Sequence, residues 1–296
     1  MKMKDFLKNL EGAGYVVTDS VAAISVWLAI RDRGNDHIPA VVLDGPPGTG
    51  KTFLAEKTAE VLGAKMFFFQ FFRGAGKEEM LFDLDLSRVI RGMSGDYSPE
   101  RFADMLSLGV LPQAIRASKS RRVVLVLDEM DKAHPSTDAL LLDFLQSARL
   151  HIPHIGELQA NSENLLVIFT KNDERDLAEP LLRRCRPVLM SFPSAEVEVS
   201  MIESATGCYG PLAKAIVTMA AKVRSSGVAK VPSTPELVRL VGDVTLLAAN
   251  GAENLIGEVI FNTFYPDGHV PEGLSFKKNQ VAGIFLALMK EGRKDE

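Results

Sequence analysis

The sequence predicts an α/β protein in which a parallel sheet is covered by helices on both faces and is followed by a small all-helical domain. Two observations favour this fold class. Short runs that are apolar at every position alternate with longer segments of helical periodicity, as in strands buried on both faces. Beyond about residue 192 only the helical periodicity continues. We therefore expect an αβα domain over residues 1–193 and a helical lid domain over residues 194–296.

The apolar runs give the order of the expected strands, which are Ala40–Leu43, Met66–Phe69, Val123–Leu127, Leu165–Phe169 and Val188–Met190. In the second run and its continuation, MFFFQFF, apolar residues fall on both faces, which favours a covered strand over an aromatic loop. The segment that follows, residues 73–83, is the better candidate for a partner surface. Among the helices, Ser136 is expected as an N-cap, and Ser233 and Glu236 have the spacing of a capping box.

Composition narrows the class of protein. The chain has 296 residues, 46% of them hydrophobic, and a formal net charge of -4, so nucleic acid is not the expected partner. Two cysteines are too few for a disulfide framework and suggest a reducing compartment. The first residues lack the apolar core of a signal peptide, and the apolar stretch 21–30 is too short to span a bilayer. We expect a cytoplasmic protein without a membrane anchor.

The segment VVLDGPPGTGKT joins the first expected strand to a helix through a glycine-rich loop. It fits the P-loop pattern G-x-x-x-x-G-K-[ST], in which backbone N–H groups and a helix N-terminus surround phosphate oxygens. Lys51 is expected to reach the β and γ phosphates, and the Thr52 hydroxyl to coordinate Mg²⁺. The alternative is a glycine-rich turn with a surface lysine. The expected binding residues are Gly45, Pro46, Pro47, Gly48, Thr49, Gly50, Lys51, Thr52 and Asp128.

A second candidate element of the site is acidic and lies in the segment RRVVLVLDEMDKA. Its apolar run is an expected strand that ends at Asp128 and Glu129, and open α/β sheets bind ligands at the carboxyl ends of their strands. Asp128 is expected to hold Mg²⁺ together with Thr52, through water. Glu129 is then free to orient and polarise an attacking water, which favours hydrolysis over simple binding. The alternative is a charged pair that ends a strand.

Two further polar segments follow the next strand. Asn172 ends NLLVIFTKN, where it can hydrogen-bond an attacking water or a γ-phosphate, or simply form a turn. The Asn-Lys-x-Asp element of many GTPases is absent from TKND, which favours ATP. In EPLLRRCRP, Arg183, Arg184 and Arg186 can offer a guanidinium to a γ-phosphate of a neighbouring subunit. A solvated basic helix end is the alternative.

Taken in order, GPPGTGKT, VLVLDEMDKA and VIFTKNDERDLAEPLLRRC resemble the AAA+ ATPases, and among them the MoxR-like group that includes the CbbQ-type activases. The resemblance is close over about residues 15–192 and loose beyond. It implies a three-layer αβα P-loop NTPase domain with a helical lid, and ATP sites between the subunits of a ring, with a hexamer expected. It makes Asn172 the sensor-1 residue and Arg183 and Arg184 candidate trans-acting fingers. The place of a sensor-2 arginine is taken by PSTPEL, with Arg239 late in that helix.

The function this resemblance implies is Mg²⁺-dependent ATP hydrolysis that remodels or activates a protein partner, as a chaperone-like hydrolase acting on a client or through an adaptor. Two alternatives stay open. A nucleic-acid motor or restriction component of the McrB type has a similar core, although the overall acidity counts against it. A small-molecule P-loop kinase shares the phosphate loop, although the Asp128–Glu129 pair and Asn172 count against it.

Overall fold

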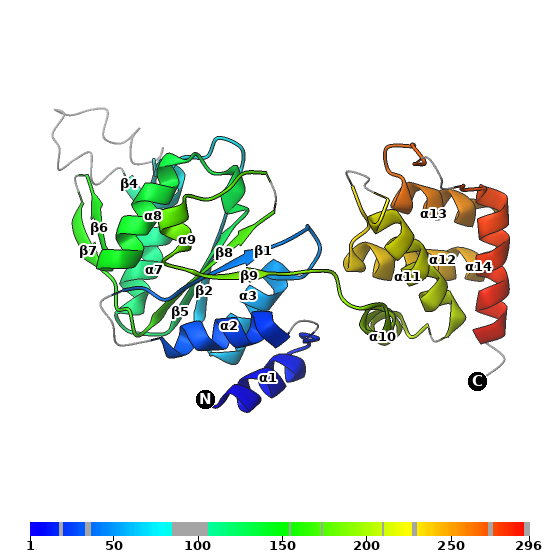
Figure 1. Ribbon diagram of the computed structural model, residues 1–296, viewed down its shortest axis with the longest axis horizontal. Coiled ribbons are helices and arrows are strands. Elements are labelled where there is room, and N and C mark those ends of the chain that lie inside the picture. The colour runs from blue at the N-terminus through cyan, green and yellow to red at the C-terminus, as the bar shows by residue number, and fades with distance from the viewer. Residues whose placement is uncertain are drawn as a thin grey trace. The chain divides into compact units, whose positions relative to one another are not determined.

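The computed structural model describes residues 1–17, 20–32, 37–84, 106–153, 155–172, 174–208, 210–226, 230–271 and 275–292 (Figure 1). Contacts divide the chain into two compact units. The first contains residues 1–46 and 50–191, and the second contains residues 192–296, with which residues 47–49 are grouped.

The first unit is built on a parallel sheet. Its strands are β1 Ala40–Asp44, β2 Lys65–Gln70, β5 Val123–Asp128, β8 Leu165–Lys171 and β9 Arg186–Leu189. They lie side by side in the order β2-β5-β8-β1-β9, and every neighbouring pair is parallel. All of the apolar runs predicted as strands therefore belong to one sheet, which confirms the predicted fold class.

Helices cover both faces of this sheet (Figure 1). In β5, Val124 and Val126 pack on one side and Leu125 and Leu127 on the other, so the strand feeds two separate cores. The first core is completed by α1 Met3–Gly12, α2 Ser20–Arg31 and α3 Lys51–Val61. The second is completed by α4 Glu78–Leu81, α7 Val110–Ser118, α8 Ser136–Ser147 and α9 Glu179–Leu182. The result is a three-layer αβα arrangement.

Strand β2 differs from its prediction. It forms one edge of the sheet, and its side chains are not all covered. Phe68 is 42% exposed, and Phe72, just after the strand, is 57% exposed, whereas Phe67 and Phe71 are buried. The prediction of a fully covered strand is therefore wrong, because an apolar run does not reveal whether its strand is central or at an edge.

Short antiparallel pairs project from this core. Strand β3 Phe82–Leu84 pairs with β4 Leu106–Leu108, and β6 Arg149–Ile152 forms a hairpin with β7 Gly156–Gln159 before β8. Helix α8 begins at Ser136 itself, and its N-cap position is Pro135, without a side-chain hydrogen bond. The prediction of Ser136 as the N-cap is wrong; its hydroxyl instead lies 2.7 Å from Nδ1 of His134.

The second unit is a bundle of helices around its own apolar core. Its elements are α10 Ala195–Thr206, α11 Pro211–Arg224, α12 Thr234–Ala249, η2 Glu253–Leu255, α13 Ile256–Phe264 and α14 Lys278–Gly292. A buried ion pair joins three of the helices: Arg224 binds both carboxylate oxygens of Glu198, at 2.8 and 3.0 Å, and the Thr234 hydroxyl donates to the same carboxylate.

The predicted capping box at the start of α12 is present, with the Ser233 backbone N–H donating to the Glu236 carboxylate at 2.8 Å. Throughout the part of the chain that the structure describes, no helix combines the length and apolar character needed to cross a bilayer.

Candidate active site

The glycine-rich loop lies where the sequence predicts it, between β1 and α3, at the carboxyl edge of the sheet. Gly45 has φ +148°, and a Cβ there would lie 2.1 Å from the carbonyl oxygen of Met190. Gly50, the N-cap of α3, has φ +89°, which side chains with a Cβ rarely adopt. Between them lie Pro46, Pro47, Gly48 and Thr49. The loop therefore needs glycine at both ends, and it leads into a helix N-terminus suited to anions.

Lys51 is the buried cation of this loop, with 7% of its surface exposed. Its ammonium group donates to the carbonyl oxygens of Gly45 at 2.5 Å and Pro46 at 2.8 Å, and to Oδ1 of Asn172 at 3.0 Å. Burial lowers the pKa of Lys51, and the nearby Asp128 carboxylate opposes that shift. The structure thus brings Asn172, which follows β8, to the lysine of the loop, 121 residues earlier in the chain.

Asp128 ends β5 in a buried position next to the loop. Its Oδ1 accepts hydrogen bonds from the Thr52 hydroxyl at 2.8 Å and from the Thr170 hydroxyl at 2.7 Å. Thr170 was expected only as a polar residue at this edge of the sheet, without a role; its hydroxyl also accepts from the backbone N–H of Glu129, at 3.0 Å. One threonine of β8 therefore fixes both acidic residues.

The oxygens of Thr52 and Asp128 fit Mg²⁺, which prefers oxygen ligands and usually keeps several waters and binds substrate phosphates. Within the described ranges, no group of three or more His, Cys, Asp or Glu side chains is arranged to hold a metal ion. The donor set is therefore that of a metal shared with phosphate and water, rather than of a cage made by protein alone.

Glu129 occupies an unusual backbone conformation, left-handed with φ +55° and ψ +46°, just before the turn η1 Met130–Lys132. Such angles are uncommon for a residue with a side chain and are often found at functional sites. Its Oε2 accepts hydrogen bonds from Gln70 Nε2 at 2.9 Å and from Lys132 Nζ at 2.8 Å. Burial raises the pKa of Glu129, but these two hydrogen bonds together with the positive charges of Lys132 and Lys51 outweigh it and hold the pKa below its ordinary value.

The sequence analysis missed both partners of Glu129. Gln70 is the last residue of β2 and lies opposite Asp128 in the parallel register, which is what brings it to Glu129. Lys132 lies three residues after Glu129, and this spacing alone indicated that the two side chains could pair. A hollow of about 490 Å³ opens beside them, and its lining residues are Gln70, Phe71, Phe72, Arg73, Glu129, Lys132 and Glu174.

Asp131 is a further missed residue, and it anchors the polar end of β8. It is 3% exposed, and its Oδ2 accepts from the backbone N–H groups of Asn172 and Glu174, both at 3.0 Å. The chain therefore turns in a fixed way after β8, and the Asn172 side chain is held toward Lys51.

The predicted arginines lie elsewhere. Arg186 opens β9 opposite Val41, at the amino edge of the sheet, whereas the loop follows Asp44 at the carboxyl edge. Arg183 is exposed and pairs with Glu179 one turn earlier. With the Gln146 amide oriented so that its oxygen faces Arg184, that oxygen accepts from Nε at 3.0 Å and Nη2 at 3.1 Å.

These arginines surround a cavity of about 270 Å³, lined by Ala29, Asp32, His37, Pro39, Ala40, Arg183, Arg184, Cys185 and Arg186. Guanidinium groups around one opening suit an anion. The structure therefore unites the loop, Asp128, Glu129 and Asn172 in one place, and sets Arg183 and Arg184 apart from them.

Comparison with known proteins agrees with this geometry. Residues 40–185 match the family "AAA domain (dynein-related subfamily)". A Lon protease of Mycoplasma mobile is 32% identical over 176 residues, which are 55% of this chain and 19% of that protein. A ClpB chaperone of Mycoplasmoides gallisepticum is 30% identical over 199 residues, which are 63% of this chain and 26% of that protein.

Among solved structures, a RuvB mutant of Thermotoga maritima covers 93% of this chain and 73% of its own, with a TM-score of 0.49 and 17% identity. The chain spans about a fifth of the length of the Lon protease and about a quarter of the length of the ClpB chaperone. The matched region contains four strands of the sheet, β1, β2, β5 and β8, and the glycine-rich loop. Over residues 40–185 the chain therefore resembles an AAA domain, and the comparisons support ATP hydrolysis as its activity.

Proposed function

We propose that this chain is a Mg²⁺-dependent ATPase of the MoxR-like type that works as a ring, with a hexamer expected, and remodels or activates a protein partner. The observation that carries the proposal is the separation of the phosphate-type loop from Arg183 and Arg184 on one sheet. The loop with Lys51 lies at the carboxyl edge, and Arg183 and Arg184 lie near the amino edge. A subunit that holds ATP at one edge would offer its arginines to a neighbour at the other.

In this proposal, the backbone of residues 45–50 and the Lys51 ammonium bind the phosphates of ATP. Thr52 and Asp128 hold Mg²⁺, which when bound supplies positive charge to the phosphate oxygens. Lys51 needs little rearrangement, because burial and its contact with Asn172 already keep it at the loop. Asn172 is then placed to contact the γ-phosphate or the attacking water.

Glu129 orients the water that attacks the γ-phosphorus, while the bond from that phosphorus to the oxygen of ADP breaks. The water proton passes toward the Glu129 carboxylate. Gln70 and Lys132 position this carboxylate and keep it ionised, since both donate to its Oε2. Water in the hollow beside these three side chains would approach from the open side.

Arg183 and Arg184 would stabilise the transition-state charge in the site of the neighbouring subunit. Arg183 suits such a role because its side chain is 75% exposed and, among the described residues, it pairs with the equally exposed Glu179. The protein partner, a client or a separate adaptor, is proposed to bind elsewhere on the ring. We further propose that the protein is located in the cytoplasm and that its ATPase activity does not require nucleic acid.

The test is Glu129→Gln, which keeps the shape of the side chain and removes its charge. We expect ATP turnover to fall by about 10²–10⁴-fold, the range for loss of a general base, with nucleotide binding retained. Glu60→Gln is the matched control, because Glu60 also pairs with a lysine three residues away, Lys57, at 2.7 Å. Unchanged turnover in Glu129→Gln would contradict the proposal. A requirement for an acceptor molecule before any ATP is consumed would favour a kinase.

A further inference from the structure

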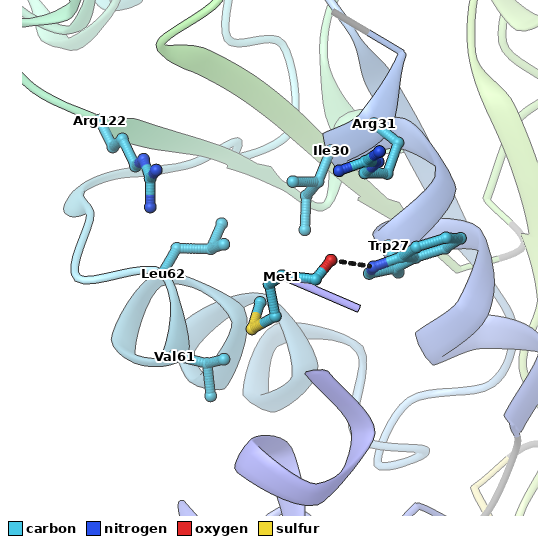
Figure 2. Close-up of a pocket in the computed structure, with 7 residues that line it drawn as sticks. All are labelled: Met1, Trp27, Ile30, Arg31, Val61, Leu62 and Arg122. Carbon is cyan, nitrogen blue, oxygen red and sulfur yellow. Dashed lines mark hydrogen bonds between the residues drawn. The ribbon is translucent and has the colours of Figure 1, made fainter. Parts of the chain in front are cut away.

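A cavity of about 270 Å³ lies on the side of the first unit that α2 and α3 cover (Figure 2). Helix α3 begins at Lys51 in the phosphate-binding loop and ends at Val61 in the cavity wall. Eleven residues of helix correspond to about 16 Å. The cavity is therefore separate from the candidate active site, although one helix reaches from one to the other.

The walls of this cavity are apolar. Trp27 and Ile30 come from α2, and Val61 and Leu62 come from the end of α3. The indole N–H of Trp27 donates to the carbonyl oxygen of Met1 at 3.3 Å, which holds the ring in place (Figure 2). An apolar wall that reaches the surface offers a place for an apolar group of another molecule.

Met1 and two exposed arginines complete the lining, with Arg31 at the end of α2 and Arg122 just before β5. In Figure 2 their guanidinium groups lie on either side of Ile30. Among the residues that the structure describes, neither guanidinium has a carboxylate within 4.0 Å. Arg186, by contrast, pairs with Asp32 at 3.3 Å. The cavity thus joins apolar walls to two cations that lack a described counter-ion, in a chain whose net charge is -4.

We infer that this cavity docks a segment of a partner protein in which one large apolar side chain is flanked by carboxylates. Its volume exceeds the about 150 Å³ that holds a benzene ring. It is below the about 300–1,000 Å³ of pockets that enclose a whole small molecule. One side chain of a longer chain fits that range, and the carboxylates beside it would pair with Arg31 and Arg122.

The inference rests on the proposed function only in taking the occupant to be a protein partner. Its test uses the fact that Trp27 is the single tryptophan of the chain, so tryptophan emission reports on this cavity alone. The full chain is titrated, without ATP, with the acetylated and amidated peptide Glu-Glu-Phe-Glu-Glu. We expect a saturable change in emission, and none with peptides that carry Ala in place of Phe or Lys in place of Glu.

Variants locate the binding. Replacing Arg31→Ala and Arg122→Ala together should weaken the peptide about tenfold, because each exposed ion pair is worth up to about 1 kcal/mol. Arg121→Ala is the matched control, because it is the exposed neighbour of Arg122 and does not line the cavity; its affinity should stay within about twofold of the parent. Because all three side chains are exposed, the fold should survive, and thermal melting verifies it.

Three results would overturn the inference: no saturable change with the acidic Phe peptide, an equal response to the lysine peptide, or equal weakening by Arg121→Ala. Decanoate distinguishes a free amphipathic acid from a protein segment. Saturable binding of decanoate without binding of the peptide would also overturn it. Since the titration needs neither ATP nor a ring, loss of the proposed ATPase function would leave this result standing, and the reverse also holds.

Discussion

The charged residues at the two edges of the sheet in the first unit differ in their burial. At the carboxyl edge, Lys51 and Asp128 are buried and hydrogen-bonded, Lys51 to Asn172 and Asp128 to Thr52. Near the amino edge, Arg183 is largely exposed and paired with Glu179 on the surface. A buried network is fixed and costly to rearrange, whereas an exposed ion pair contributes little and exchanges partners readily. The first suits a bound substrate, and the second suits a group that acts on another molecule.

The largest expected effect tests the amino edge. Replacing Arg183→Ala and Arg184→Ala together should lower ATP turnover by about 10³-fold or more, the range seen for arginine fingers, while nucleotide binding persists. Steady-state turnover and equilibrium binding measure the two quantities separately. Arg149→Ala is the control, because Arg149 is also an exposed arginine paired with a glutamate. An equal loss of nucleotide binding would mean that these arginines act in the site of their own subunit. That result would contradict the role assigned to the amino edge.

A smaller effect tests the fixed loop at the carboxyl edge. In Gly45→Ala the added Cβ would meet the Met190 carbonyl oxygen at 2.1 Å, so the backbone must move. We expect a loss of about 1–3 kcal/mol in the free energy of unfolding, as for overpacking, together with weaker nucleotide binding. Gly63→Ala separates overlap from backbone strain, because Gly63 also has positive φ but its Cβ would meet nothing within 4 Å. Equal losses in both variants would show that the overlap is unimportant.

The smallest expected effect concerns the hydrogen bonds to Glu129. Its pKa lies below the ordinary value, so the carboxylate stays charged to lower pH than a free glutamate. Lys132→Met removes the cation that favours the charged form, so the pKa should rise and the acid limb of kcat should move to higher pH. Lys57→Met is the matched control, since Lys57 pairs with Glu60 at the same spacing. A limb that stays in place would mean that Glu129 does not control it.

The sequence predicts the parts of this site that lie in continuous segments. The loop from Gly45 to Thr52 and the pair Asp128–Glu129 each follow an apolar run, and the strand positions fix which edge of the sheet they reach. Gln70 could not be found in this way, because it meets Glu129 only when β2 and β5 are neighbours in the sheet. Strand order is a tertiary property, and a lone glutamine at a strand end gives no local signal of it.

Burial was predicted less well than position. The run Met66–Phe69 and Phe72 have the composition of a covered strand, yet Phe68 is 42% exposed on the edge strand β2. Asp131 was also missed, since its role is to hold backbone N–H groups about 40 residues away. An apolar pattern indicates that side chains can be buried, and only the assembled sheet shows which of them are buried.

The most direct test of the shared-site account mixes two inactive proteins. Glu129→Gln keeps its arginines, and the Arg183→Ala, Arg184→Ala variant keeps its glutamate. The account predicts that ATP turnover reappears on mixing, because a subunit with an intact Glu129 receives arginines from a neighbour with an altered one. If turnover stays absent although labelled subunits are shown to exchange, the arginines do not complete a neighbour's site and the central claim is wrong.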